Sequence, residues 1–502
     1  MAAVTALIPA YHEVTKHSPQ SVRRPGRGLD WANKPSPYKE YEPGLETVAL
    51  ARPDRPLPVA ALDAVGGRYG PRVGLDGALV GRILNLGAGV IRRMAVSPSQ
   101  GMEFRTYASA GGLYPVEVYA VAGPLPGVPA GVYHYHPRRR ELLRLRAGDH
   151  RGSVAAATSN EAAVATAPLT LLLTGIPWRT AWKYGARGFR HLWWDAGTML
   201  ANLVALCVAA GLPARVVLGF DDAAIERLLG VGWPGEFPLA LLAVGDDAPE
   251  PGAPAEGVPD LVLPSRPLSA RTVVYPEIED AARAGRLTAG EVEGWRSRAD
   301  PQGPPATAPP ASPADTSATL EAVIRRRGSA RSFDRAPIAR EVLDDILGRS
   351  TAGVPTDLAP QGSRLVEPFA IANRVDGLDP GAYVYDGGLR LLGAGDFAEV
   401  AGFLCLEQWL AHDAAATAFL MVDLNRILGR LGDRGYRAAQ LEAGVVAGRM
   451  YLAAYAHGLG ATGLTFYDDA VTEFFRTPGE VDRACMLVTA VGPSTRRLLP
   501  LA

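Results

Sequence analysis

Cysteine is scarce in this sequence, and its few cysteines do not cluster. The 502 residues include only Cys207, Cys405 and Cys485, which lie far apart and form no CxxC pair. Disulfide-stapled domains and structural zinc sites both need closely spaced cysteines or histidines. The sequence therefore predicts neither a disulfide scaffold nor a metal site, and this cysteine usage suits the reducing cytoplasm.

An excess of charge of either sign is also missing. Lys and Arg total 51 and Asp and Glu total 52, so the formal net charge is −1. Nucleic acids and anionic membrane surfaces attract proteins that carry a strong basic excess. We therefore expect neither as the main partner, and any anion site must be local.

Long hydrophobic runs are absent as well. The longest, Leu200–Leu212, contains Asn202 and ends at Pro213, which is short of the ~20 residues that span a bilayer. Met1–Ala10 is mildly apolar but has no basic stretch before it, unlike a secretory signal. We expect a soluble protein in which Leu200–Leu212 belongs to a buried helix.

The chain has enough apolar residues to build a large core. Hydrophobic residues make up 48% of it and charged residues 21%. Disordered chains combine low hydrophobicity with high net charge, so wholesale disorder is excluded. At ~100–200 residues per domain, the length predicts two to four domains.

A long internal repeat reduces that number to two copies of one domain type. Gly185–Glu226 aligns without a gap onto Gly432–Glu473, 247 positions downstream. A period of this length excludes a solenoid of short repeats. The identical residues include the pairs Arg187/Arg434, Arg190/Arg437 and Asp221-Asp222/Asp468-Asp469.

Both copies predict the same elements, which mix strands with long helices. Apolar runs bounded by polar residues predict buried strands. These are Val116–Val121, Val132–Tyr135, Leu142–Leu145, Leu169–Gly175 and Leu239–Val244, then Pro368–Ala372, Ala382–Tyr385, Leu389–Leu392, Ala418–Val422 and Cys485–Val491. The expected central helices are Arg190–Ala210, apolar on nearly all faces, and Arg437–His457. Without strict βαβ alternation, this pattern predicts an α+β fold.

A proline-rich stretch marks the boundary between the copies. Residues 301–313 (PQGPPATAPPASP) have no strand pattern and are too rich in proline for a helix, which indicates an extended linker. Before them, Glu277–Arg298 is typical of one or two short bridging helices. We place the first domain at residues 1–250, a linker with short helices at 251–316 and the second domain at 317–502.

Three segments suit the binding of an anion or a flat ligand. Arg325–Phe333 (RRRGSARSF) follows an expected helix, Thr319–Arg326, and its guanidiniums and hydroxyl suit a phosphate. Arg496-Arg497 follows the last strand, and the small residues of Arg105–Pro115 let a backbone approach a ligand closely. Simpler interpretations stay open for each: a solvated helix end, a basic tail and a flexible loop.

A fourth segment, just before the first central helix, suits proton transfer. Lys183 and Tyr184 are adjacent, and burial or a nearby cation can bring the pKa of either toward neutrality. The alternative is a surface lysine beside a tyrosine that only packs.

The two copies differ in these segments. The second copy has Arg430-Leu431 in place of Lys183-Tyr184, and Ala359–Arg364 in place of the small-residue loop. The first copy lacks the Arg-x-Ser-x-Arg pattern, and its last strand is followed by the acidic Asp246-Asp247. Each copy has what the other lacks. This predicts that two ancestral sites at a two-fold interface were reduced to one composite site.

Together these motifs resemble the nitroreductase-like flavoproteins, and among them the SagB/McbC-type azoline dehydrogenases (ThcOx family), in a tandem form. The resemblance implies a mixed, mainly antiparallel sheet flanked by helices, in an intrachain pseudodimer that is monomeric or forms a homodimer, with FMN at the domain interface. Ala108–Gly111 and Arg327–Ser329 depart from the Pro-Ser-Ala-Gly and Arg-Arg-Ser that are usual in the family. Both departures keep the polar side chain, so we expect the flavin still to bind but with a different affinity. The motifs are Tyr11–Ser18, Asn33–Tyr41, Ser109–Pro115, Lys183–Arg190, Arg327–Arg331 and Gly458–Asp469.

The resemblance also assigns residues to the flavin. It implies that Arg327, Ser329 and Arg331 hold the FMN phosphate and ribityl chain, with Arg496 or Arg497 closing on the phosphate. The turn Gly463-Leu464-Thr465 would lie along the flavin face, and the loop Ser109-Ala110-Gly111 would come from the other half. Lys183-Tyr184 matches the catalytic pair of the azoline dehydrogenases.

The reaction implied is removal of two hydrogens from a thiazoline or oxazoline in a peptide or peptide-like substrate. FMN takes the hydride and O₂ reoxidises it; a cyclodehydratase or a carrier would be the partner. Two alternatives remain: an NAD(P)H-dependent reductase of nitro compounds, quinones or enones, and a cofactor-free peptide-binding scaffold subunit.

Overall fold

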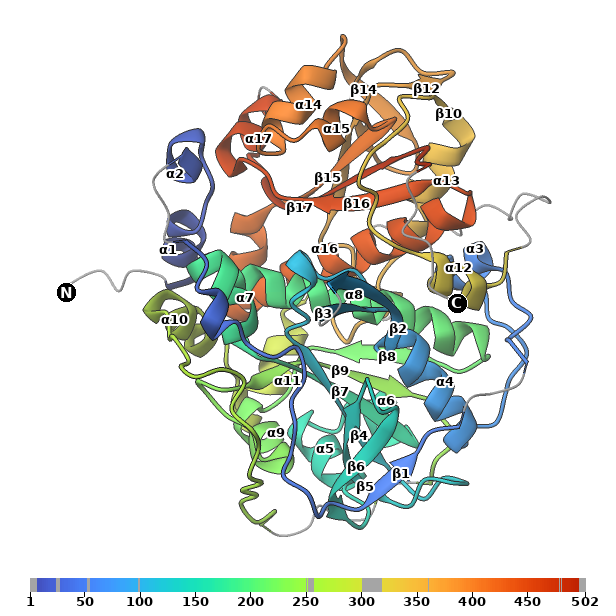
Figure 1. Ribbon diagram of the computed structural model, residues 1–502, viewed down its shortest axis with the longest axis vertical. Helices are drawn as coiled ribbons and strands as arrows, with labels where there is room; N and C mark the ends of the chain where they lie inside the picture. The colour runs from blue at the N-terminus through green and yellow to red at the C-terminus, as the bar shows by residue number, and fades with distance from the viewer. Residues whose placement is uncertain are drawn as a thin grey trace.

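Each half of the chain folds around one antiparallel sheet. The computed structural model describes residues 7–23, 28–51, 55–97, 100–249, 251, 257–299, 318–359, 361–477, 479 and 481–495. The expected linker at 301–313 and Arg496-Arg497 lie outside these residues. The first sheet has the strand order β1-β6-β5-β4-β7-β9-β8 and the second the order β14-β13-β11-β15-β17-β16. In Figure 1 they lie below and above a central layer of helices.

All ten expected strands are present, within a few residues of the predicted ends. The strands of the first half are β1 Thr47–Ala49, β2 Val90–Ser97, β3 Gln100–Arg105, β4 Val116–Ala122, β5 Gly131–His136, β6 Glu141–Ala147, β7 Leu169–Gly175, β8 Ala214–Val217 and β9 Phe237–Val244. Those of the second half are β10 Ile338–Ala339, β11 Glu367–Ala372, β12 Val375–Asp376, β13 Gly381–Tyr385, β14 Leu389–Ala394, β15 Ala416–Val422, β16 Gly460–Leu464 and β17 Ala484–Gly492.

The helices complete an α+β fold with the same plan in both halves, as predicted. The first half has α1 Leu7–Val14, α2 Pro19–Arg23, α3 Ala61–Val65, α4 Gly77–Gly87, α5 Arg151–Ala157, α6 Ala162–Ala165, α7 Pro177–Tyr184, α8 Gly188–Ala209 and α9 Asp222–Leu229. Between the halves lie α10 Pro276–Ala284 and α11 Ala289–Ser297, where short bridging helices were expected. The second half has α12 Leu320–Arg326, α13 Arg340–Ser350, α14 Ala398–Leu404, α15 Trp409–Asp413, α16 Leu424–Ala456 and α17 Asp468–Phe474.

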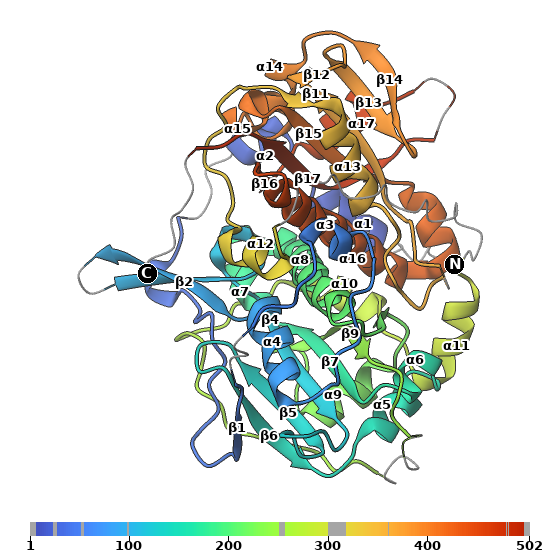
Figure 2. The same cartoon turned by 90° about the vertical axis from the view of Figure 1, so that its right-hand side faces the viewer.

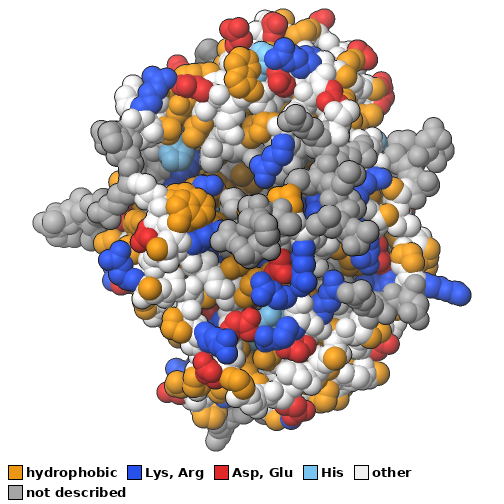
Figure 3. All heavy atoms as spheres, in the orientation of Figure 1, with side chains coloured by type: hydrophobic (Ala, Val, Ile, Leu, Met, Phe, Trp, Pro, Cys, Tyr) orange, Lys and Arg blue, Asp and Glu red, His pale blue; other side chains and the backbone are white. Residues whose placement is uncertain are grey.

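Helices α8 and α16 pack against each other between the two sheets (Figure 1). Every residue of α8 is buried, which confirms the central position predicted from its apolar faces. Pro177–Ala209 is long and apolar enough to cross a membrane, but its apolar window is entirely buried inside the protein. On the face drawn in Figure 3, Lys and Arg side chains are interspersed with Asp and Glu.

The second central helix starts earlier than expected. The sequence predicts a start at Arg437, whereas α16 begins at Leu424 and continues through a kink at Gly432, where φ is 60°. The counterpart of this kink is Gly185 (φ 56°), which ends α7 before α8. Glycine adopts this left-handed conformation without a steric penalty, so the chain can bend there without a loop.

Three glycines allow α8 and α16 to touch backbone to backbone. A Cβ added at Gly197 would lie 2.4 Å from Leu441 O, and one at Gly444 would lie 2.6 Å from Trp194 O. One at Gly448 would lie 2.6 Å from Ala201 Cβ and 2.9 Å from Thr198 Cα. The helices must move apart to accept any side chain at these positions.

We expect Gly444→Ala to lower the free energy of unfolding by about 1–3 kcal/mol, because it overpacks this contact. Gly429, in the same helix, has no atom within 4 Å of an added Cβ. Gly429→Ala is therefore the control and should be stabilising, because alanine favours the helix. Urea unfolding followed by circular dichroism compares the two. Equal stability of both variants would contradict the close contact.

The two halves are related by a pseudo-two-fold arrangement of buried ion pairs. Each of two aspartates accepts from two arginines of the opposite half. The contacts are Arg187–Asp468 (2.9 Å), Arg190–Asp468 (2.7 Å), Arg434–Asp222 (2.6 Å) and Arg437–Asp222 (3.2 Å). All the side chains involved are buried.

These contacts correct one detail of the repeat alignment. The gap-free alignment pairs Asp221 with Asp468, whereas the ion pairs make Asp222 the counterpart of Asp468. The backbone N–H groups of Leu287 and His17 donate to these two carboxylates in the same way. The copies therefore differ by one residue between the edge strand and the helix that follows it.

Candidate functional site

Tyr451 of α16 joins two of the predicted segments. Its hydroxyl lies 3.1 Å from Ser329 Oγ and accepts a hydrogen bond of 2.6 Å from Gly463 N–H. The Arg-Gly-Ser segment after α12 thus lies beside the end of β16. The sequence predicts a turn at Gly463 and Leu464, but this prediction is wrong. Both residues pair with β17 and are the last residues of β16. Thr465 follows directly.

Arg327 reaches from the second half to the small-residue loop of the first. Its Nε donates to Thr106 O (3.1 Å) and its Nη2 donates to Arg105 O (3.2 Å), and the side chain is buried. The structure therefore brings together two segments more than 200 residues apart.

The small-residue loop is held by Asp195 of α8. Ser109 Oγ donates to the Asp195 carboxylate, and Ala110 N–H donates to Asp195 Oδ1 at 3.0 Å. Burial raises the Asp195 pKa to about 7, against the lowering effect of these hydrogen bonds. Sequence reasoning missed Asp195. The available signal was its repeat partner Glu442, which accepts from Ser363 Oγ at 2.5 Å, because both copies have an acid at this position of the repeat.

Replacing Asp195 by Asn should change how stability depends on pH. A raised carboxyl pKa contributes stability that is fully present below about pH 4 and lost as the pH rises through about 7. Asp195→Asn removes this loss, so its free energy of unfolding should gain on the wild type between pH 5 and pH 8. Urea unfolding at both values measures this gain. Asp260→Asn, at an exposed side chain, is the control, and parallel pH curves for Asp195→Asn and the wild type would refute the effect.

Lys183 and Tyr184 both face the small-residue loop. A Cβ added at Gly111, where φ is 62°, would lie 3.0 Å from Tyr184 OH and 3.2 Å from Lys183 Nζ. Burial, then the charges of Arg331 and Lys34, lowers the pKa of Lys183. Burial and Asp195 raise that of Tyr184. The expected shift toward neutrality thus holds for Lys183 and is wrong for Tyr184, because no cation outweighs its burial.

Behind Tyr184 lies a group of buried polar side chains. The His191 ring stacks on Tyr184 with centroids 4.0 Å apart, and burial lowers its pKa well below the usual value, so it is neutral. Trp194 Nε1 donates to Gln440 Oε1 at 2.5 Å. Within the described chain, both His191 ring nitrogens have no hydrogen-bond partner. Buried polar atoms of this kind normally have one, so they suit a polar ligand.

Arg92 of β2 adds a second buried guanidinium beside Arg327. Burial and the charge of Arg327 lower the Arg92 pKa, and its Nε and Nη2 have no partner among the described residues. A Cβ added at Gly328 would lie 3.6 Å from Arg92 Nη1, so this side chain also borders the Arg-Gly-Ser segment. Two such guanidiniums from opposite halves suit a phosphate. The donor set therefore fits a cofactor that carries a phosphate group. Sequence reasoning missed Arg92, because only folding places the β2–β3 hairpin there.

The pseudo-symmetric counterpart of this site is filled by the chain itself. In the first half, Val216–Leu218 occupies the place of Gly463–Thr465. Val216 N–H donates to Pro355 O at 2.7 Å, and Asp357 N–H donates to Val216 O at 3.0 Å. The Asp357 carboxylate accepts from Leu218 and Gly219 N–H, both at 2.9 Å. The backbone of Gly463–Thr465 borders the candidate site, whereas the equivalent backbone, Val216–Leu218, is covered by residues 355–357.

The chain holds two copies of one antiparallel α+β domain, and segments of both halves meet at the candidate site. A model of the nitroreductase family matches residues 71–246 and 324–492. The chain belongs to the nitroreductase family.

Relatives match one half of the chain or all of it. A predicted nitroreductase of Methanocaldococcus jannaschii, MJ1384, is 33% identical over 142 residues, which are 28% of this chain and 70% of that protein. The microcin B17-processing protein McbC of Escherichia coli is 28% identical over 155 residues, 30% of this chain and 57% of McbC. A crystal structure of a predicted nitroreductase from Anabaena variabilis matches with a TM-score of 0.76 and 25% identity, covering 97% of this chain and 99% of that one.

Proposed function

We propose that this chain is an FMN-dependent dehydrogenase that oxidises a thiazoline or oxazoline in a peptide or peptide-like intermediate to the azole. The observation that carries the proposal is the meeting of Lys183 and Tyr184 with the loop at Gly111, beside guanidiniums from both halves. The relative McbC, named for its role in processing microcin B17, supports a peptide substrate in natural-product biosynthesis. The proposed location is the cytoplasm, with a cyclodehydratase or carrier as partner.

The proposed cofactor site uses residues of both halves. Arg92 and Arg327 would hold the phosphate, with Ser329 and Arg331 next to the ribityl chain. The backbone of Ser109-Ala110-Gly111 and of Gly463-Leu464-Thr465 would border the flavin. Arg496 and Arg497, proposed to close on the phosphate, lie outside the described residues. When bound, FMN would accept the hydride and O₂ would reoxidise it.

The chain itself would handle the proton. The lowered pKa of Lys183 favours a neutral amine, which can take a proton from the ring carbon of the substrate at Nζ. Tyr184, whose pKa is raised, keeps its proton and can donate a hydrogen bond to the ring. Its stack on His191 fixes the direction of the hydroxyl.

Flavin stoichiometry and product mass test this proposal together. We expect one FMN per chain, because residues 355–357 cover the counterpart site. A thiazoline-containing peptide should lose the mass of two hydrogens on incubation in air. Two FMN per chain would contradict the single composite site, and a colourless protein would favour a scaffold subunit.

Arg92→Glu should weaken FMN binding by on the order of 100-fold or more, since it places a carboxylate beside the proposed phosphate site. Arg93→Glu is the matched control, because Arg93 is adjacent and 67% exposed. Fluorescence titration of the apoprotein with FMN measures both. Equal affinities would rule out a phosphate contact by Arg92.

The family match also favours a second candidate, an NAD(P)H-dependent reductase of nitro compounds, quinones or enones. In that case NADPH should bleach the bound flavin without any peptide. Bleaching by the azoline peptide alone would favour the dehydrogenase.

A further inference from the structure

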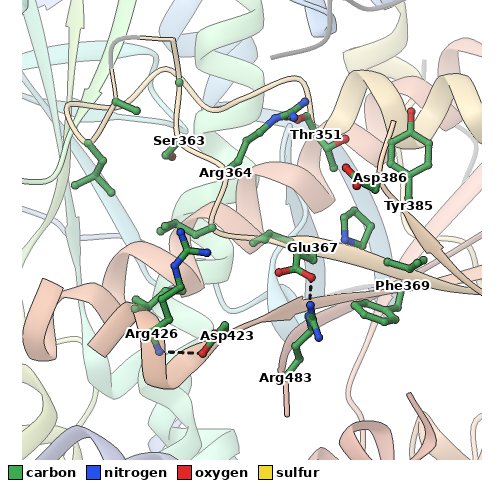
Figure 4. Close-up of a pocket in the computed structure, with 18 of the residues that line it drawn as sticks. Thr351, Ser363, Arg364, Glu367, Phe369, Tyr385, Asp386, Asp423, Arg426 and Arg483 are labelled. Carbon is green, nitrogen blue, oxygen red and sulfur yellow. Dashed lines mark hydrogen bonds and ion pairs between the residues drawn. The ribbon is translucent and has the colours of Figure 1, made fainter. Parts of the chain in front are cut away.

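A charged cavity of about 440 Å³ lies in the second half, apart from the candidate flavin site. It is lined by residues 358–359 and 362–369, the end of β13, the first turns of α16 and the residue before β17. Figure 4 shows Arg364, Glu367, Asp423, Arg426 and Arg483 around it. None of the residues assigned above to the flavin or to proton transfer lines this cavity.

The equivalent space in the first half is filled by a segment of the chain, Ser36–Tyr41, which bends at Pro37-Tyr38. Ser36 O accepts from Arg179 Nε at 2.8 Å, which holds the segment by its backbone. The Lys39 ammonium lies 2.7 Å from Glu236 Oε2 and 2.8 Å from Tyr119 OH. This side of the fold thus holds a peptide segment through one backbone carbonyl and one charged side chain.

Strand pairing fixes which residues correspond. Glu236 directly precedes β9 and Arg483 directly precedes β17, and both strands carry the same irregularity opposite β7 and β15. Tyr119 corresponds to Phe369, because each sits at the same register of its sheet. Arg179 corresponds to Arg426, counted from the kinks at Gly185 and Gly432. The backbone-holding arginine is therefore kept.

The charge that meets the peptide side chain is reversed. Where Glu236 holds Lys39 in the first half, the second half has Arg483, which pairs with Glu367 at 2.6 Å. The lining as a whole is basic, since it comprises Arg298, Arg364, Arg390, Arg426, Arg430 and Arg483 against Glu367, Asp386 and Asp423. A ligand shaped like Ser36–Tyr41 would need a carboxylate where Lys39 has an ammonium.

We propose that this cavity binds a peptide segment with a carboxylate side chain at the position equivalent to Lys39. Arg426 holds the peptide backbone and Arg483 holds the carboxylate. The site involves no redox chemistry. Only the further step, that this peptide is part of the dehydrogenase substrate, rests on the proposed function.

Two labelled hexapeptides test the site in the full chain. Both peptides copy Ser36–Tyr41, with Ala in place of Glu40. A glutamate at that position would face the acidic Asp386, which is the counterpart of His136 in the second half. One is Ser-Pro-Tyr-Glu-Ala-Tyr and the other Ser-Pro-Tyr-Lys-Ala-Tyr, both carrying fluorescein. In fluorescence anisotropy, we expect the Glu peptide to bind at least about 10-fold more tightly than the Lys peptide. This ratio is the expected effect of one well-placed charge pair.

Arg483→Glu should reverse this preference, Arg483→Met should abolish it, and Arg283→Glu, at an exposed side chain of α10, should leave it unchanged. Unchanged circular-dichroism spectra and thermal unfolding show that the variants are folded whether or not the protein binds FMN, so failure here is distinguishable from failure of the proposed function. No saturable binding, or an unchanged preference in Arg483→Glu, would overturn the proposal. Binding only after residues 301–313 are replaced by a Gly-Ser segment of equal length would also overturn it, because the occupant would then be the chain itself.

Discussion

Replacing Lys183 by Met should lower turnover of an azoline peptide by about 10²–10⁴-fold, the range of a lost acid or base, while the protein stays yellow. Tyr184→Phe keeps the stack on His191 but removes the hydroxyl next to Gly111, and should lose a similar factor. Steady-state turnover and the absorbance of bound flavin are the two measurements.

Lys183→Arg distinguishes proton transfer from simple charge. It keeps a cation beside the loop, but a guanidinium does not lose its proton in this pH range, so activity should still be lost. Lys16→Met, at a lysine paired with Glu13 and Asp469, is the control. If Lys183→Met and Tyr184→Phe were both fully active, neither residue would have a catalytic role.

Asp468→Ala should cost about 3–5 kcal/mol of the free energy of unfolding, because it leaves two buried guanidiniums without a counter-charge. Arg187 and Arg190 are the residues left unpaired, and both are buried. Asp222→Ala should cost a similar amount, because Asp222 holds Arg434 and Arg437 in the same way. The exposed neighbour provides the control Asp469→Ala, and a loss in Asp468→Ala no larger than in this control would contradict the argument.

The same carboxylate should sensitise the wild type to acid. Burial raises the pKa of Asp468, but Arg187 and Arg190 outweigh it and hold the value at about 2. A depressed pKa contributes stability that is present above pH 4 and lost as the pH falls through about 2. In thermal unfolding at pH 4, 3 and 2, the difference in stability between the wild type and Asp468→Ala should therefore shrink as the pH falls.

Those parts of the fold that follow from local pattern were predicted well. Apolar runs such as β7 and β15, and a helix with apolar faces such as α8, are buried in any packing of the chain. The strands and the central helix could therefore be predicted from the sequence, and the repeat from residue identity. The start of α16 was not, because the kink at Gly432 resembles a helix end in sequence.

The site was predictable only where residues cluster along the chain. Lys183-Tyr184 and the Arg-Gly-Ser segment form visible motifs, whereas Arg92, Asp195 and Tyr451 stand alone and are brought in by the pairing of β2 with β3 and by the contact of α8 with α16. The direction of the Tyr184 pKa depends on what buries the ring, which no spacing reveals.

Covering of the counterpart site by residues 355–357 has a consequence for how such a chain can change. In a homodimer every substitution appears twice, so a segment that blocks one site blocks both and ends activity. Joining the two copies covalently removes that constraint. Asp357 can bind the backbone of Leu218 and Gly219 without any effect on the equivalent backbone near Thr465. The half that no longer needs its own site is free to stabilise the molecule and to acquire other ligands.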